Sequence, residues 1–331
     1  MAAINNLQAR YYHPAGTNLP IILLMHGWDG GLESITDATL KRIGDYGAFT
    51  CAVGLRGRNA ANGARDASGR EIYDIYDCLQ SIISTHGALV DGSRVAVWGY
   101  SGGGGNALAS LCKFPDTYNV GVDFMGMSDY GRDGTDGWYQ QSVGATQTAI
   151  AAAVGGTPAT APNGYYARDA TVAIANFTGG HLYMYHDNAD ATVPPVHSSR
   201  IKNVLDGAGM SNYTLTLSDT LGHGYPDGYP VRQAPEASLV AALIGSTAWT
   251  IPASGTVTVI GYIVIKRFTI WLRANGSTTY GLDAVATVVY DTATDTYTVT
   301  PLTGAIDVTI TQGAKTGSAT NISAETEIVV I

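Results

Sequence analysis

Residues 95–109 read VAVWGYSGGGGNALA, which is an apolar run, a tight turn with one serine at its apex, and the start of a helix. Residues 99–103 fit the pattern G-x-S-x-G, in which small residues let a strand reverse into a helix while the central residue holds a strained backbone. Such a turn lifts the Ser101 hydroxyl above the end of a sheet. The helix that follows adds free N–H groups and a partial positive charge, which suit an oxyanion forming beside Ser101. The stretch therefore predicts a nucleophilic serine that attacks a carbonyl group.

A nucleophilic serine needs a base that takes its proton, and the base needs a partner that holds its tautomer. We predict His223 as the base and Asp190 as its partner, because each follows a predicted strand and so emerges at the same sheet edge as Ser101. The chain order serine, acid, histidine is the one expected for this kind of sheet. The alternative acids near these candidates are Asp187, Asp219 and Asp227. Asp187 directly follows His186 and is expected to act in the turn.

The second oxyanion donor is expected in the His-Gly-Trp loop that follows the first strong strand. We predict the backbone N–H of Trp28, acting with the backbone N–H of Gly102. His26 is expected to brace this loop. As residues that contact substrate we predict His26, Tyr100 and Arg56.

A metal centre is the other chemistry to consider. His181 and His186 lie five positions apart on a predicted strand, so they face opposite sides, and no cysteine or carboxylate cluster at ligand spacing accompanies them. We predict no catalytic metal and no cofactor.

Apolar runs alternate with helical patterns through the first 250 or so residues. Residues 21–25 form a continuous apolar run, typical of a strand buried on both faces. In residues 71–83 aliphatic side chains recur at helical spacing, with Asp74 and Asp77 outside that stripe. Further strands are expected at 48–55, 119–125, 182–186 and 213–217, and further helices at 32–46, 196–206 and 235–245. This alternation indicates crossover units, and hence a mostly parallel sheet with helices on both faces.

Two segments depart from the alternation. Residues 126–176 form a long stretch rich in Gly, Ala, Thr, Asp and Tyr, which we expect to be an irregular lid or substrate wall with a short helix at 146–154. From residue 250 the sequence shifts to alternating Thr, Val, Ile and Tyr with frequent turns, which predicts an all-β, sandwich-like domain of six to eight strands. We therefore expect an α/β domain at 1–249 and an accessory β-domain at 250–331.

Composition narrows the class of protein. The 331 residues are 45% hydrophobic, enough for a large core. Lys and Arg total 18 against 27 Asp and Glu, and the net charge of −9 argues against binding to nucleic acid or to an anionic membrane surface. The odd number of cysteines, without C-x-x-C spacing, predicts buried reduced thiols rather than a disulfide framework. These cysteines are Cys51, Cys78 and Cys112.

The first residues show no signal-peptide pattern, and no uncharged apolar run is long enough to span a bilayer. A cytoplasmic location is the default expectation. A virus particle and a non-classical export route stay open, as does the oligomeric state.

Several segments resemble the α/β-hydrolase superfamily, and within it the catalytic domain of the prolyl oligopeptidase and acyl-peptidase branch with its esterase relatives. They are His26-Gly27, Gly99–Gly103, Gly155-Gly156-Thr157-Pro158 with Tyr165–Asp169, His186 through Asp190 to Val193-Pro194, and Gly222-His223-Gly224. The resemblance covers about residues 20–246. Its most specific part is the spaced pattern His-x3-Asp-x2-Val-Pro, which carries the family's triad acid onto Asp190. It implies an α/β-hydrolase fold and a Ser-His-Asp hydrolase that works through an acyl-enzyme.

Two features set the chain apart within that branch. The peptidases generally place a β-propeller before the hydrolase domain, whereas here the strands start almost at the N-terminus, so small esterases are the closer comparison. The C-terminal β-domain is not a usual part of the family and resembles targeting or carbohydrate-binding modules, or adaptors of virions and cell surfaces.

Three functions are therefore to be compared. The favoured one is a serine esterase for small-molecule or polysaccharide esters, such as acetyl esters. The alternative is a prolyl-oligopeptidase-like or acyl-aminoacyl peptidase, in which Arg56, Arg58 or Arg168 would hold a peptide terminus. The third is a binding or structural protein whose β-domain presents aromatic rings to a sugar. The candidate rings are Trp271, Tyr280, Tyr290 and Tyr297.

Overall fold

A computed structural model describes residues 8–58, 63–131, 137–220, 222–224 and 230–331, with the backbone alone described for 230–234. Its N-terminal part is built on a seven-stranded sheet of order β1-β3-β2-β4-β5-β6-β7. Every neighbouring pair is parallel except β1 and β3, which are antiparallel. The strands are β1 Ala9–Tyr12, β2 Leu19–Met25, β3 Phe49–Val53, β4 Val90–Tyr100, β5 Val120–Phe124, β6 His181–Asp187 and β7 Tyr213–Ser218. The predicted mostly parallel α/β sheet is confirmed.

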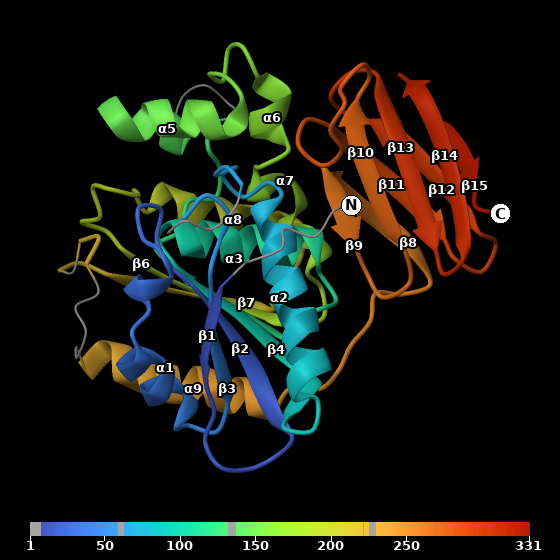
Figure 1. Cartoon of the computed structure of the whole chain (residues 1–331). Coiled ribbons are helices and arrows are strands. Elements are labelled where there is room, and N and C mark those ends of the chain that lie inside the picture. The colour runs from blue at the N-terminus through green and yellow to red at the C-terminus, as the bar shows by residue number, and fades with distance from the viewer. Residues whose placement is uncertain (1–7, 59–62, 132–136, 221, 225–229) are drawn as a thin grey trace.

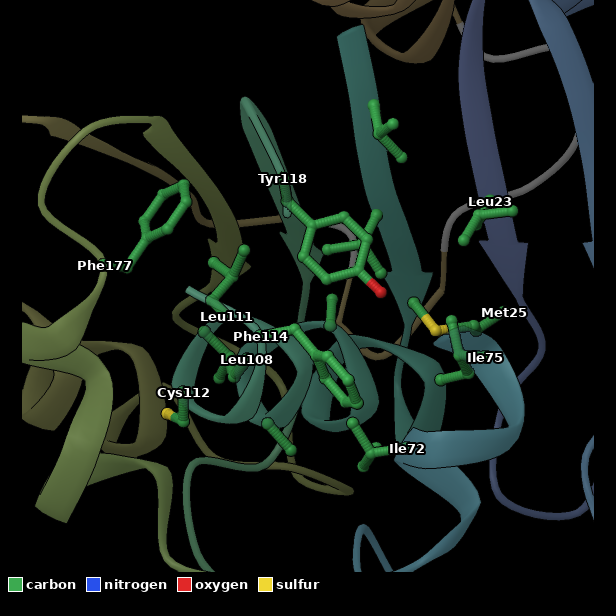
Figure 2. Packing of buried hydrophobic residues seen from close by; sticks show 14 of the residues in the cluster. Leu23, Met25, Ile72, Ile75, Leu108, Leu111, Cys112, Phe114, Tyr118 and Phe177 are labelled. Atoms are coloured by element: carbon green, nitrogen blue, oxygen red, sulfur yellow. The ribbon is translucent and has the colours of Figure 1, made fainter. Parts of the chain in front are cut away.

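Helices cover both faces of this sheet (Figure 1). One face carries α1 Asp37–Gly44 and α9 Pro230–Ile244, and the other carries α2 Glu71–His86, α3 Gly102–Lys113 and α8 Val196–Gly207. Because successive strand residues point to opposite faces, β2 serves both cores: Leu23 and Met25 pack with α2 and α3, whereas Ile22 and Leu24 pack with α1 and α9. Figure 2 shows Leu23 and Met25 beside the side chains of those two helices. Burial on both faces explains why β2 is a continuous apolar run.

Two predicted stretches differ from the structure in their helices. The helix expected at 32–46 is a 3-10 turn, Leu32–Ser34, followed by α1, because the Thr36 side chain accepts the N–H of Thr39 and starts the α-helix there. The stretch expected to be irregular is largely helical. Its elements are α4 Trp138–Gln141, α5 Gly144–Val154, α6 Pro162–Tyr166, α7 Ala170–Ala173 and the 3-10 turn Ile174–Asn176. Helices α5 and α6 lie beyond the carboxyl edge of the sheet (Figure 1), whereas α7 and the 3-10 turn pack against α3 and α8.

Residues 254–329 form eight antiparallel strands of order β14-β13-β10-β9-β8-β11-β12-β15. They are β8 Ser254–Ile260, β9 Tyr262–Val264, β10 Thr269–Ala274, β11 Val285–Asp291, β12 Thr296–Pro301, β13 Ile306–Gln312, β14 Lys315–Ile322 and β15 Thr326–Val329. The two end strands approach each other, since the Thr316 N–H donates to the Ile331 carbonyl at 3.1 Å. The sheet therefore curls around its own apolar core. Tyr290 and Tyr297 lie inside that core, at 3% and 0% exposure, so they cannot stack on a sugar.

The β-domain packs against the side of the α/β domain that carries α2, α3 and α7 (Figure 1). The ring of Tyr262 is fully buried against Phe114, at the end of α3, and against Trp271. Lys113 is also fully buried: its Nζ donates to the carbonyls of Ala167 and Ile260, and it lies 4.6 Å from the centre of the Tyr262 ring. The expected accessory domain thus shares a core with the catalytic one.

The three cysteines are free thiols in this structure. Cys51 and Cys112 are buried, whereas Cys78 is half-buried, with its Sγ 3.9 Å from that of Cys51. None of the helices in the described parts of the chain is long and apolar enough to cross a membrane.

Candidate active site

Ser101 sits at a strained turn between β4 and α3. Its φ of 55° and ψ of −122° are unusual for a residue with a side chain. Glycines make the turn sterically feasible: a Cβ at Gly99 would lie 1.8 Å from the Gly103 carbonyl oxygen, and a Cβ at Gly103 would lie 2.3 Å from that of Met25. The local sequence thus forces Ser101 to the carboxyl edge of the sheet.

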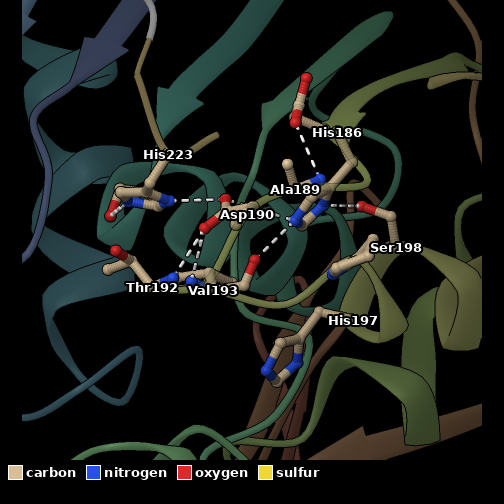
Figure 3. Close-up of polar contacts among 12 residues, drawn as sticks. His186, Ala189, Asp190, Thr192, Val193, His197, Ser198 and His223 are labelled. Carbon is tan, nitrogen blue, oxygen red and sulfur yellow. Dashed lines mark hydrogen bonds and ion pairs between the residues drawn. The ribbon is translucent and has the colours of Figure 1, made fainter. Parts of the chain in front are cut away.

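The structure brings Ser101, His223 and Asp190 into one hydrogen-bonded chain. The His223 Nε2 lies 2.9 Å from the Ser101 Oγ, and its Nδ1 lies 2.6 Å from Oδ2 of Asp190 (Figure 3 shows the second contact). The other carboxylate oxygen, Oδ1, accepts the N–H groups of Thr192 and Val193, both at 2.9 Å. With Nδ1–H donating to a carboxylate, Nε2 is left to accept the serine proton.

The Asp190 carboxyl is held in its charged form. Its side chain is fully buried, and burial alone would raise its pKa. The hydrogen bonds from His223 and from the Val193 N–H, together with the His186 ring 3.6 Å away, outweigh burial, so the pKa of Asp190 lies well below its usual value. A charged Asp190 can stabilise the imidazolium that forms when His223 takes a proton.

The rival acids have other partners. Asp187 accepts the Ala189 N–H at 2.9 Å and the Ser218 hydroxyl at 2.6 Å, the turn role expected for it. Asp219 accepts from the side chain of Asn188. Asp227 lies outside the described residues.

The two expected oxyanion donors lie next to each other. A Cβ at Gly102 would be 2.6 Å from the backbone nitrogen of Trp28. The backbone segments that carry the two N–H groups are therefore in contact beside Ser101. His26 is buried, which lowers its pKa, and its Nδ1 lies 2.9 Å from the carbonyl of Gly27. A neutral His26 thus braces the loop that carries Trp28, and it also lines the cavity described below.

The structure places the two other residues expected to contact substrate, Tyr100 and Arg56, in different surroundings. Tyr100 lines the cavity, and its hydroxyl donates to the backbone carbonyl of His223, so it also holds the histidine loop. Arg56 does not line the cavity. Its guanidinium is paired with Asp74 through Nε, at 2.6 Å, and through Nη2. The Asp74 side chain, which the helical pattern placed outside the buried stripe, is 3% exposed and draws Arg56 to it.

A cavity of about 680 Å³ opens over Ser101 and His223. Aromatic and apolar side chains form much of its wall: Trp28, Trp98, Phe124, Trp138 and Val143. Trp138 and Val143 come from the segment expected to be a lid or substrate wall. The cavity is thus large and apolar enough to hold the side chains of a small organic substrate.

An ion pair in the same wall was not predicted from the sequence. Arg42 on α1 donates to both carboxylate oxygens of Glu236 on α9, at 2.9 and 3.0 Å. The partners are 194 residues apart, so no local pattern could have indicated the contact.

A second unpredicted contact holds the helical segment over the site. His197 on α8 lies 2.9 Å through Nε2 from the amide oxygen of Gln141, a cavity residue on α4. Its Nδ1 accepts the N–H of Ser128 at 3.2 Å. Burial lowers the pKa of His197 to about 3, so the neutral ring donates to Gln141.

Among the described residues, no group of three or more His, Cys, Asp and Glu side chains is arranged to hold a metal ion. His181 and His186, considered above as ligands, bind Thr214 and Ser198 instead.

The sequence profile of the prolyl oligopeptidase family matches residues 54–238, more than half of the chain. The chain belongs to the prolyl oligopeptidase family. This membership, with the α/β-hydrolase fold, confirms the resemblance inferred from the sequence.

Several solved structures have a similar fold. A puromycin hydrolase superposes with a TM-score of 0.61 at 20% identity, covering 74% of this chain and 38% of its own. The acylaminoacyl peptidase of Pyrococcus horikoshii gives 0.61 at 18% identity, covering 75% and 41%. Dipeptidyl peptidase 4 of Porphyromonas gingivalis gives 0.56 at 18% identity, covering 71% and 33%. No curated protein sequence matches the chain.

The prolyl oligopeptidase-family chain therefore spans between about a third and two fifths of the length of these neighbours. At such identities the likeness is one of fold, and substrate has to be inferred from this chain's own site.

Proposed function

We propose that the protein is a serine peptidase that hydrolyses an amide bond next to a residue with a large apolar side chain. The observation that carries the proposal is the hydrogen-bonded chain from Ser101 through His223 to Asp190. Family membership favours a peptide bond over an ester as the bond that is cleaved. This reverses the order expected from the sequence.

The reaction follows from the geometry. As the Ser101 Oγ attacks the carbonyl carbon, its proton passes to Nε2 of His223, and Asp190 stabilises the imidazolium. The N–H groups of Trp28 and Gly102 hold the oxyanion. His223 then gives the proton to the leaving amine, which departs and leaves an acyl-enzyme on Ser101. A water molecule, deprotonated by His223, hydrolyses that ester and restores the serine.

The cavity wall supports the choice of side chain. Trp28 and Trp138 meet edge to face, with ring centres 5.1 Å apart, and both line the cavity beside Ser101. A flexible aliphatic or aromatic group of the substrate would bury against these rings. Two arginines in or near the site are paired with carboxylates, Arg42 with Glu236 and Arg56 with Asp74.

That pairing also favours a second candidate. A peptide terminus would find these arginines neutralised by carboxylates, whereas an uncharged alcohol leaving group needs no such partner. A carboxylic ester, including the polysaccharide ester expected from the sequence, is therefore the second proposed substrate class.

The test is a fluorophosphonate label followed by paired substrates that share one acyl group, an aminoacyl anilide and the matching ester. We expect the wild type to be labelled and to cleave the anilide with a kcat/KM comparable to that for the ester. Ser101→Ala should lose the label and about a million-fold in turnover, whereas Ser81→Ala, on the exposed face of α2, should match the wild type.

The outcomes separate the candidates. Labelling with ester cleavage but no anilide cleavage would replace the peptidase by the esterase. An unlabelled wild type, or equal turnover in Ser101→Ala, would overturn both.

A further inference from the structure

Asp190 has a second histidine behind it. Its Oδ2 lies 2.6 Å from Nδ1 of His223 and 3.6 Å from Nε2 of His186. His186 is fully buried, whereas the His223 side chain is 18% exposed. Figure 3 shows the carboxylate between the two rings. One imidazole therefore faces the cavity, and the other lies inside the protein.

The contacts of His186 show where its protons lie. Its Nε2 is 2.7 Å from the carbonyl oxygen of Val193, which can only accept, so Nε2 carries a hydrogen. Its Nδ1 is 2.7 Å from the hydroxyl of Ser198. A hydroxyl can donate to a neutral ring and accept from a protonated one. The pocket around His186 thus satisfies both charge states with no more than a rotation of one hydroxyl.

The neighbouring charges favour the protonated ring. Burial lowers the pKa of His186, but the Asp190 carboxylate 3.6 Å away, the hydrogen bond to the Val193 carbonyl and the charge of Asp123 on β5 outweigh burial, so the pKa lies above its usual value. Burial raises the pKa of Asp123 to about 6. His197, on α8, stays neutral, as its depressed pKa indicates. Around Asp190, the groups whose pKa is raised therefore include both Asp123 and His186.

We propose that His186 is a positioning residue of the catalytic relay: it holds the Asp190 carboxylate from behind, and its positive charge weakens the hold of Asp190 on the His223 imidazolium. The proposal rests on the serine-hydrolase function proposed above. A carboxylate shared by two cations stabilises each of them less than it would stabilise one alone. Removing the charge of His186 while keeping its hydrogen bond should therefore make His223 retain its proton to a higher pH.

His186→Gln is the variant that separates charge from hydrogen bonding, because a glutamine amide can still donate to the Val193 carbonyl but cannot be protonated. The readout is the rate at which a fluorophosphonate labels Ser101 between pH 5 and pH 9, which needs no knowledge of the substrate. We expect the acid limb of this profile to move to higher pH, by on the order of one unit. The matched control is His181→Gln on the same strand, which should leave the limb in place.

Ser198→Ala is a second, milder variant in case His186→Gln folds poorly. It leaves a protonated Nδ1–H without its acceptor, which disfavours the charged ring, so the limb should move in the same direction by less. A limb that stays in place in every folded variant, with only an overall fall in rate, would show a purely structural role and overturn the inference. If the wild type itself is not labelled, both the proposed function and this inference fail. Normal labelling in which the acid limb does not move in the variants rejects only the role of His186.

Discussion

The two ends of helix α3 differ in their side chains. The N-terminal end consists of glycines, which have no side chain, whereas side chains pack closely around the C-terminal end. At the first end four consecutive glycines follow Ser101, whose backbone is strained, and the serine faces an open cavity. At the other end Lys113 is fully buried beneath the ring of Tyr262, which belongs to the β-domain. The helix between these ends is 12 residues long and buried throughout.

The difference shows how the molecule maintains a strained site. A backbone conformation that costs about 1–3 kcal/mol persists only where the surroundings over-determine it. The glycine end offers few side chains for that purpose, so the packing has to come from elsewhere along the helix. We infer that the β-domain, by enclosing Phe114 and Lys113, helps to hold the far end of α3 and with it the position of Ser101.

The largest expected effect comes from removing the β-domain, which encloses the C-terminal end of α3. Deleting residues 250–331 would expose Phe114 and Tyr73, which pack on Tyr262, and would take the Ile260 carbonyl from Lys113. We expect no folded, soluble protein, as judged by size-exclusion chromatography and thermal melting followed by circular dichroism. Cooperative melting of residues 1–249 near the full-length temperature would show that the two ends of α3 are independent.

A smaller effect is expected from adding one methyl group at the glycine end. In Gly103→Ala the new Cβ would lie 2.3 Å from the carbonyl oxygen of Met25 and 2.7 Å from that of His26, so the loop that carries Trp28 has to move. We expect a fall of roughly a hundred-fold or more in kcat, the size seen when one oxyanion donor is lost.

The matched control for this substitution is Gly105→Ala, two residues along the same helix. A Cβ there would lie 2.9 Å from the Sδ of Met127 and 3.0 Å from the Met127 carbonyl oxygen, less close than the 2.3 Å approach to backbone at Gly103. We expect it to retain most of the activity. Equal kcat values for both variants would argue that the glycine end tolerates side chains after all.

The smallest expected effect is a pH dependence of the stability that comes from Lys113, at the C-terminal end of α3. Burial, with the nearby charge of Arg168, lowers the pKa of Lys113 from 10.5 to about 7. Between these values the unfolded chain binds a proton that the folded protein does not, so stability rises with pH, by about 1.4 kcal/mol per unit at most, and levels off below pH 7. Lys113→Met removes this slope.

The measurement is the free energy of unfolding of wild type and Lys113→Met in urea, at pH 7.5 and pH 9.5. The stability of the wild type relative to the variant should be greater at the higher pH, because Lys113 is then neutral in both states for a larger fraction of molecules. A difference that does not change with pH would mean that the buried amine keeps its proton.

What the sequence predicts well is local or strictly periodic. The turn at Ser101 follows from glycines within four residues of it, and Asp190 from its spacing to His186 and Val193-Pro194. The structure brings both to His223. Strand β2 was predictable because burial on both faces leaves an unbroken apolar run.

What the sequence does not predict depends on distant partners. Arg56 looked available to substrate because its partner, Asp74, lies on a helix 18 residues away, and nothing in the helical pattern marks that aspartate as buried. The segment at 126–176 looked irregular because its helices are short and stabilised by packing of Trp138, Ile150 and Tyr165 against Trp28 and Tyr130. His186 stood in a recognised pattern, yet its place behind Asp190 emerged only from the fold.

The contact between Lys113 and the Ile260 carbonyl spans 147 positions of the chain. During synthesis the ribosome therefore releases Ser101, and the helix behind it, long before the segment that covers Lys113. Until that segment emerges, the amine stays hydrated and protonated, and the end of the helix remains undocked. The order of translation thus delays assembly of the hydrolytic centre until the segment around Ile260 has emerged.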